Sequence, residues 1–109
     1  AVYVGLFTSN PTDAGSGAEV VDSGYIRQRA HTSVASDGFT VPANGVSSNA
    51  RNLIFPAIVD SQKVVTHWGI FDAQTGGNLL YHSSMTNPKT LDPTDVLSFP
   101  IGSLIVTLA

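Results

Sequence analysis

The longest strand-forming stretch of the chain is Val64–Met85, which reads Val64-Val65-Thr66-His67-Trp68-Gly69-Ile70-Phe71-Asp72, Ala73-Gln74-Thr75-Gly76-Gly77 and Asn78-Leu79-Leu80-Tyr81-His82-Ser83-Ser84-Met85. Two runs rich in β-branched and aromatic residues flank a short segment that holds the only Gly-Gly pair of the chain. This arrangement is typical of a β-hairpin. The stretch also contains the only Trp, the only Met and two of the three His. We therefore expect the core to form around it.

The simplest register of this hairpin pairs Phe71 with Leu79, which puts His82 opposite Trp68. Side chains alternate between the two faces of a strand, so this register also predicts which residues pack together. The exposed tip is expected at Asp72–Asn78. The packed face is expected to consist of Trp68, Ile70, Leu80 and His82.

Shorter strands are predicted on both sides of the hairpin, separated by turn signals and with no helical period between them. The turn signals are Asp37-Gly38, Asn44-Gly45, Asn87-Pro88 and Asp92-Pro93. The expected strands are Ala1–Thr8, Gly24–His31, Phe39–Val41, Ser47–Phe55, Val96–Phe99 and Ser103–Leu108. Together with the hairpin they predict an all-β domain over residues 1–109, a β-sandwich or jelly roll of seven to eight short antiparallel strands.

The composition restricts the partners of this domain. Charged residues are only 12% of the chain, against roughly 25% in typical soluble domains. The net charge is −3 and the five basic residues are scattered, which argues against a nucleic-acid-binding face. No apolar run reaches the ~18 residues of a membrane span. There is no Cys, so disulfides and thiolate metal sites are excluded.

The residues give little indication of catalysis or of a cofactor. Serines are abundant, but the sequence has no Gly-x-Ser-x-Gly elbow. His67, placed opposite Ser83 by the predicted register, and His82 lie near Asp72, yet zinc needs three or four converging ligands. Packing of these His residues in the fold is the commoner situation. We therefore expect no metal, no cofactor and no enzymatic activity.

Two further patterns have ordinary explanations. Gly15-Ser16-Gly17 lacks the third Gly of a dinucleotide fingerprint and the Lys of a P-loop. The carboxylates that glycoside cleavage would need lie mostly in turns, where Asp is expected for turn chemistry. Surface aromatic residues leave a sugar-stacking platform open as an alternative, with Tyr3, Tyr25, Trp68 and Tyr81 as its candidates.

Several blocks resemble a family of small bacteriophage virion proteins, often described as tail-fibre or minor structural proteins. The blocks follow one another over nearly the whole chain. They are Val4-Gly5-Leu6-Phe7-Thr8-Ser9-Asn10-Pro11-Thr12-Asp13-Ala14-Gly15-Ser16-Gly17-Ala18-Glu19-Val20, Gly24-Tyr25-Ile26-Arg27-Gln28, Asn52-Leu53-Ile54-Phe55-Pro56-Ala57, His67-Trp68-Gly69-Ile70-Phe71-Asp72-Ala73 and Gly77-Asn78-Leu79-Leu80-Tyr81-His82. The resemblance implies a non-enzymatic component of the virion.

Within that class, the main hypothesis is a capsid decoration or cement protein that stabilises the head by oligomeric docking. The alternatives are a tail or tail-fibre-associated structural protein, and a receptor- or glycan-binding module. The expected partners are further copies of the chain, for example in a trimer, and the major capsid protein or tail proteins. No nucleic acid and no membrane is expected among them.

The intersubunit contacts are predicted in segments that combine polarity with irregular backbone. These segments are the long loop Ser9–Ser23, the strand that carries two Arg residues, and the turn-rich stretch Val34–Val46. Arg is favoured at interfaces. The predicted interface residues are Asn10, Asp13, Tyr25, Arg27, Arg29 and Phe39.

Overall fold

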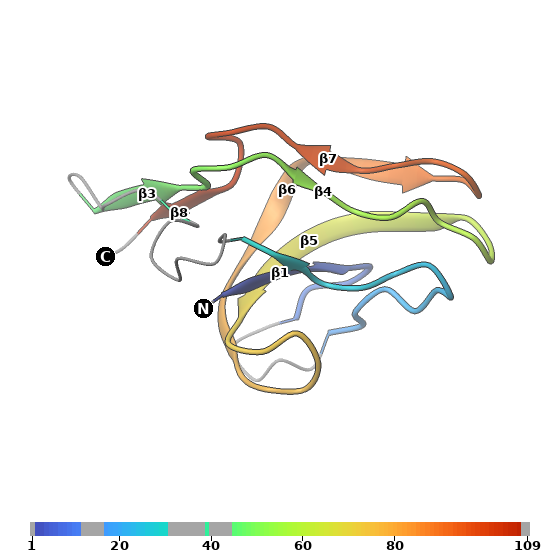
Figure 1. Ribbon diagram of the computed structural model, residues 1–109, viewed down its shortest axis with the longest axis horizontal. Coiled ribbons are helices and arrows are strands. Elements are labelled where there is room, and N and C mark those ends of the chain that lie inside the picture. Colours follow the sequence, from blue (N-terminus) through green and yellow to red (C-terminus); the bar gives the residue numbers. More distant parts are fainter. Residues whose placement is uncertain (1, 12–16, 31–38, 40–44, 108–109) are drawn as a thin grey trace.

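The computed structural model describes residues 2–11, 17–30, 39 and 45–107, which contain eight β-strands and no helix. No helix of that part of the chain is therefore long and apolar enough to cross a membrane. The strands are β1 (Tyr3–Phe7), β2 (Gln28–Arg29), β3 (Val46–Ser48), β4 (Leu53–Ile54), β5 (Lys63–Phe71), β6 (Leu79–Leu91), β7 (Ser98–Phe99) and β8 (Ile105–Thr107) (Figure 1).

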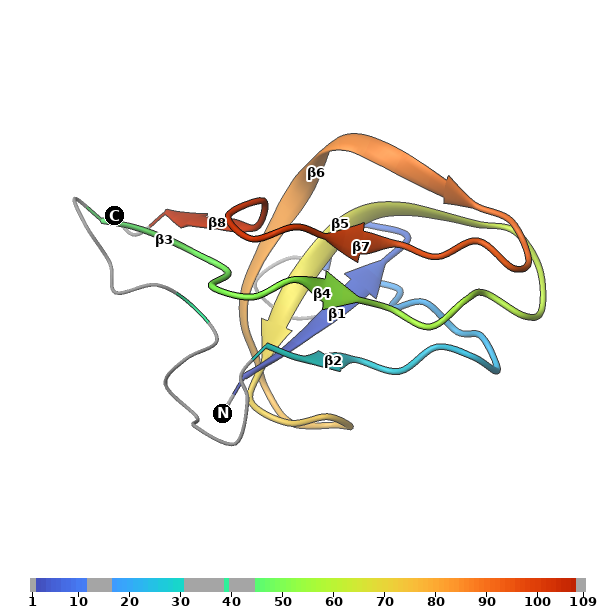
Figure 2. The same cartoon turned by 45° about the horizontal axis from the view of Figure 1, so that its top comes forward.

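The strands form one large sheet and two small ones, and every pairing among them is antiparallel. The large sheet has the order β2-β1-β5-β6, and the small sheets are β3-β8 and β4-β7. Figure 2 shows β4 and β7 lying across the large sheet, with β2 beside β4. The all-β prediction is confirmed. A β-sandwich or jelly roll is not shown by these pairings and stays a prediction.

The core lies between the large sheet and the small sheets. One cluster of buried side chains joins Val4, Leu6, Val65, Trp68 and Ile70 of β1 and β5 to residues of the opposite layer. Those residues are Leu53, Phe55, Leu97, Phe99, Leu104 and Val106. Burial of this apolar surface is the main stabilising contribution to such a fold. The expectation that the core forms around the hairpin agrees with this cluster, because Val65, Trp68 and Ile70 of β5 belong to it.

The hairpin forms as expected, but its register differs from the simplest one. Phe71 pairs with Leu79 as predicted, whereas Ile70 pairs with Tyr81, so a bulge is present between these pairs. The extra residue, Leu80, is 56% exposed. The prediction that Leu80 packs in the core was therefore wrong, because a bulge inserts one residue and reverses the faces beyond it.

The bulge also changes the partners of the histidines. His82 lies opposite Gly69 and not opposite Trp68, and His67 lies opposite Ser84. Trp68 and Ile70 are buried as predicted, and the tip at 72–78 is exposed apart from half-buried Ala73.

The predicted turn at Asn87-Pro88 is absent, because both residues lie inside β6. β6 is one of the two outer strands of the large sheet, where a missing N–H donor does not break the ladder. A second irregularity lies here, since the pair Val65–Lys89 is followed by the pair His67–Ser84. The turn at Asp92-Pro93 is confirmed by a hydrogen bond of 2.8 Å from the Asp95 N–H to the Asp92 carbonyl oxygen.

The stretch Ser47–Phe55 does not form the single predicted strand. It is divided between β3 and β4, which pair with different partners. The break lies at Asn49, whose buried amide Nδ2 donates to the carbonyl oxygens of Arg51 at 2.8 Å and Pro100 at 3.0 Å. These bonds turn the chain from one small sheet into the other. A polar side chain in a strand-like pattern is the local sign of this break.

Candidate functional site

A partly buried ion pair joins two residues of the segment between β1 and β2, Glu19 and Arg27. The Arg27 guanidinium donates to both carboxylate oxygens of Glu19, with Nε–Oε2 at 2.8 Å and Nη2–Oε1 at 2.9 Å. Arg27 is only 8% exposed. A two-point contact of this kind is the strong form of an Arg–carboxylate pair, and it raises the pKa of Arg27 because the Glu19 carboxylate accepts its hydrogen bonds.

The same guanidinium fixes the tip of the hairpin. Arg27 Nη1 donates to the carbonyl oxygens of Ala73 at 3.0 Å and Gly76 at 2.8 Å. Its Cζ lies 3.4 Å from the centroid of the Phe71 ring, which is a cation–π contact. One side chain thus connects the Glu19 segment, the last residue of β5 and the loop between β5 and β6.

Tyr25 completes this group, which we call the Arg27 cluster (Glu19, Tyr25, Arg27 and Phe71). The Tyr25 hydroxyl donates to Glu19 Oε2 at 2.6 Å and accepts from the Leu6 N–H at 3.0 Å. Burial, followed by the hydrogen bond to Glu19, raises the pKa of Tyr25. The phenol bonds to the β1 backbone between the Val4–Gln28 pair and the Phe7–Glu19 bridge.

A glycine on β1 makes room for the cluster. A Cβ at Gly5 would lie 2.8 Å from Glu19 Oε2 and 2.9 Å from Phe71 Cε1. Both distances are shorter than van der Waals contact permits. The cluster can therefore close over β1 only because residue 5 has no side chain.

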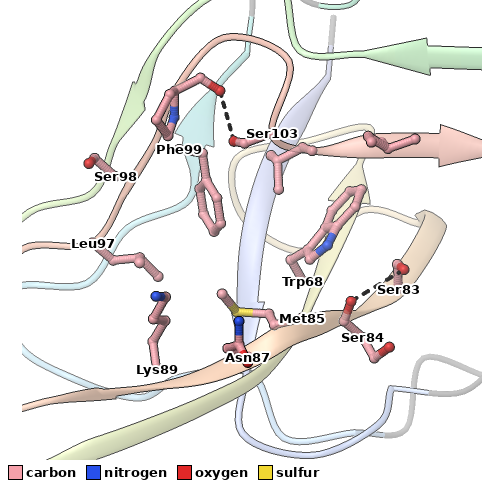
Figure 3. Close-up of a pocket in the computed structure, with 13 residues that line it drawn as sticks. Trp68, Ser83, Ser84, Met85, Asn87, Lys89, Leu97, Ser98, Phe99 and Ser103 are labelled. Carbon is pink, nitrogen blue, oxygen red and sulfur yellow. Dashed lines mark hydrogen bonds between the residues drawn. The ribbon is translucent and has the colours of Figure 1, made fainter.

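A groove of about 390 Å³ opens between β6 and the segment that carries β7 and the start of β8 (Figure 3). Figure 3 shows the side chains of Trp68, Met85, Leu97 and Phe99 directed toward its interior. Polar side chains surround them. The polar lining residues are Ser83, Ser84, Asn87, Lys89, Ser98 and Ser103.

The polar side of the groove results from an unusual feature of β6. Lys89 pairs with Val65 and Ser83 pairs with Trp68, and residues paired across a sheet project from the same face. Because Val65 and Trp68 are buried in the core, Lys89 and Ser83 project from the core-facing side of the sheet. An inward-directed charge on an outer strand discourages pairing with another strand.

The structure brings two of the predicted interface residues together, since Tyr25 and Arg27 meet at Glu19. Arg29 is exposed on β2, opposite Tyr3, and Asn10 is exposed after β1. Phe39 is half-buried against the core and bridges to Asn49. Asp13 lies outside the described residues. Whether any of these residues contacts another subunit stays a prediction.

The candidates for metal binding are dispersed. In the described ranges, no group of three or more His, Cys, Asp or Glu side chains is arranged to hold a metal ion. His67 Nδ1 lies 2.8 Å from the Thr66 hydroxyl. Asp72 accepts hydrogen bonds from the backbone N–H and side-chain amide of Asn78, and these bonds lower the pKa of Asp72.

Sequence reasoning does not identify Glu19, Asn49 or the polar residues of the groove. Glu19 follows a glycine-rich loop, and nothing local indicates that it pairs with Arg27 over Gly5 of β1. The local sign of the groove is the run Asn87-Pro88-Lys89 inside a β pattern. Such a run predicts a turn, although polar and proline residues also occur on outer strands.

The fold and these contacts define a small all-β protein built around one long hairpin. Residues 1–107 match the model of the family Gp80, described as Podophage GP4 fiber I protein gp80. The chain therefore belongs to this family of phage tail-fibre structural proteins. The resemblance to phage virion structural proteins is confirmed. No curated protein matches the chain significantly.

Family membership fits a structural role in the virion. It gives no support to capsid decoration, which is the main hypothesis from the sequence, and fits the tail-fibre alternative better.

Proposed function

We propose that this protein is a non-enzymatic structural subunit of a phage tail fibre. The observation that carries the proposal is the family match, which extends over residues 1–107 and so covers the whole described fold. The Arg27 cluster agrees with such a role, because it fixes a loop and the hairpin tip to the large sheet. A fibre subunit needs a rigid surface on which neighbouring subunits dock.

In the proposed fibre, the partners are further copies of the chain and neighbouring tail proteins. The predicted interface residues on the described surface are Asn10 and Arg29, which are exposed. Tyr25 and Arg27 contribute indirectly by holding the surrounding loops in place. The two small sheets, packed over the large one, are the second layer of the proposed sandwich.

The location is tested by labelling this protein on intact virions. A small tag joined to the exposed tip near Thr75 is detected by gold-labelled antibody in electron micrographs of whole particles. Label on fibres at the tail, with few copies per particle, is the expected result. Label over the head lattice in hundreds of copies would instead identify a capsid decoration protein and overturn the proposal.

A second candidate function, saccharide binding, is favoured by one observation. The groove has the buried side chains of Trp68, Leu97 and Phe99 at its floor and hydroxyl, amide and ammonium groups around it. Its volume is in the range of small-ligand sites. Asn87 and Lys89 are exposed and accessible to substitution without disturbing the core. Binding on a glycan array that is lost in the Asn87→Ala, Lys89→Ala double variant would support this function. An array without any signal for the wild-type protein would exclude it.

A further inference from the structure

A lysine without a counter-ion is directed into the groove between β6 and the segment of β7 and β8. Lys89 lines this groove and projects from the core-facing side of β6. Among the described residues, none forms an ion pair or a hydrogen bond with its ammonium group. The lining residues in the described part of the chain include no Asp or Glu. A single cation between neutral walls favours a ligand of negative charge at this position.

A wide bulge of β6 forms the wall that carries this lysine. The four residues 85–88 of β6 lie opposite a single residue of β5, Thr66. Two of the four, Met85 and Asn87, line the groove. Bulges redirect side chains and are frequent beside functional sites. The bulge therefore places the amide of Asn87 on the same wall of the groove as the Lys89 ammonium.

The two ends of this wall differ in their hydrogen-bonding chemistry. The lining residues of β6 extend from Ser83 to Lys89, so the ammonium lies at one end and hydroxyl groups lie at the other (Figure 3). An ammonium has donors and no acceptor. The Ser83 hydroxyl donates to the Ser84 carbonyl oxygen at 3.5 Å, and on the facing wall the Ser103 hydroxyl donates to the Pro100 carbonyl oxygen at 2.8 Å. Because each hydroxyl has used its one hydrogen, its oxygen is left as an acceptor.

These groups specify the chemistry of the ligand. It needs an anionic acceptor for the Lys89 ammonium and hydroxyl donors for the serine oxygens. Acetate has no hydroxyl donor, and a neutral sugar has no anionic acceptor. A sugar that carries a carboxylate has both. The groove volume of about 390 Å³ is in the range of small-ligand sites, so the groove offers more room than one carboxylate group needs.

An extended peptide fits the same groove less well. Such a peptide binds by pairing its backbone with the free edge of a strand. On β6 the bulge interrupts the ladder, and Pro88 has no N–H donor. The facing wall turns between Pro100 and Ser103, where the Ser103 N–H donates to the Pro100 carbonyl oxygen at 3.1 Å. Neither wall is a straight edge, so a small ligand held by side chains is favoured.

We propose that the groove binds an acidic saccharide, with the carboxylate of the sugar at the Lys89 ammonium and its hydroxyl groups at Ser83, Ser84 and Ser103. The inference rests on the second candidate function, saccharide binding at this groove. It deepens that function because it names the class of saccharide and the residue that selects it. The location of the protein on the virion does not enter the inference.

The test is an NMR titration of the whole ¹⁵N-labelled chain, which detects weak binding and locates it. The probes are glucuronic, galacturonic and N-acetylneuraminic acid, with glucose and galactose as the neutral partners of the first two. At least one acid is expected to shift the backbone signals of the groove and to bind about ten-fold more tightly than the neutral sugars, because its carboxylate accepts charge-assisted hydrogen bonds. Added NaCl is expected to weaken the binding of the acid, since Lys89 is exposed.

Two substitutions of Lys89 and one control assign the effect to this residue. Lys89→Gln is expected to weaken the binding of the acid about ten-fold and to leave the affinity for neutral sugars unchanged. Lys89→Arg keeps the charge and is expected to retain the preference for the acid. Lys63→Gln is the matched control, because Lys63 begins β5 and does not line the groove. Circular dichroism and urea midpoints establish that each variant is folded.

Several results would overturn the inference. Equal affinity for acidic and neutral sugars, or binding of the acid that survives Lys89→Gln, would leave saccharide binding in place but remove the selection by charge. Sodium acetate that binds as tightly as the acidic sugars would reduce the groove to a site for simple anions. If no sugar binds, the second candidate function fails together with this inference. None of these results changes where the protein is found on the virion, so the tail-fibre proposal is tested separately.

Discussion

The guanidinium of Arg27 stacks on the ring of Phe71, with Cζ 3.4 Å from the ring centroid. Arg27 is the residue through which the β5–β6 tip and the Glu19 segment are joined, although the two lie far apart in the sequence. The guanidinium of Arg27 donates its hydrogen bonds to Glu19, Ala73 and Gly76 of the same chain. A residue type that is typical of interfaces therefore has an architectural function at this position.

Arg27→Ala is expected to lower the free energy of unfolding by about 3 kcal/mol, because it leaves the Glu19 carboxylate partly buried without its cation. Urea denaturation monitored by Trp68 fluorescence measures the change. Arg51→Ala is the matched control, since Arg51 is exposed and its loss is expected to cost less than about 0.5 kcal/mol. Equal midpoints for the two variants would contradict the role assigned to Arg27.

Asn49→Ala is expected to lower the free energy of unfolding by about 2–3 kcal/mol. Asn49 is 0% exposed, and its Oδ1 accepts from the Leu104 N–H at 2.9 Å while Nδ2 donates to backbone oxygens. Removal of the amide leaves these buried groups without partners. Asn52→Ala removes one exposed bond to the Ile101 N–H and is expected to cost at most about 1 kcal/mol. The comparison is made by urea denaturation, and a larger loss for Asn52 would exclude our account.

Tyr25 is expected to resist ionisation in the folded protein. Burial and the hydrogen bond to Glu19 raise the pKa of Tyr25, so the neutral phenol contributes stability that is fully present below about pH 10, the ordinary Tyr pKa. That stability decreases as the pH rises further, because the unfolded chain ionises first. The ultraviolet absorbance of phenolate measures the ionisation. The absorbance of the Tyr25→Phe variant is subtracted from that of the wild type, and the difference is expected to show no phenolate near pH 10 as long as the protein is folded. Phenolate absorbance of Tyr25 in the folded protein at that pH would contradict its burial.

Thr94→Gly is expected to stabilise the protein by about 1 kcal/mol. Thr94 has φ of 80° in the turn closed by the hydrogen bond from Asp95 to Asp92, and a β-branched residue is strained in this region. Gly102 occupies the equivalent position in the turn from Pro100 to Ser103, with φ of 83°. Gly102→Ala is therefore expected to destabilise by a similar amount. Thermal unfolding measures the change in Tm, which is expected to rise for Thr94→Gly and to fall for Gly102→Ala. Shifts of both variants in the same direction would contradict the strain argument.

The local elements of this protein are specified by short runs of its sequence. The β-branched and aromatic runs around Gly76-Gly77 specify the hairpin, and Asp92-Pro93 specifies a turn, because such preferences depend on a few consecutive residues. The expected exposed tip and buried Trp68 follow from the same alternation. The blocks shared with phage virion proteins also indicate the family, because each block consists of consecutive residues.

Which of these residues meet depends on the tertiary structure alone. The bulge at Leu80 changes the partners of both histidines. Asn87-Pro88 continues a strand because, among the described residues, no strand pairs with the outer side of β6. Asn49 divides an apparent strand through bonds to residues about 50 positions away. Arg27 is buried because Glu19 and the hairpin tip supply acceptors. Contacts between residues that are not neighbours along the chain leave no local pattern, and these contacts determined the hairpin register, the strand break at Asn49 and the Arg27 cluster.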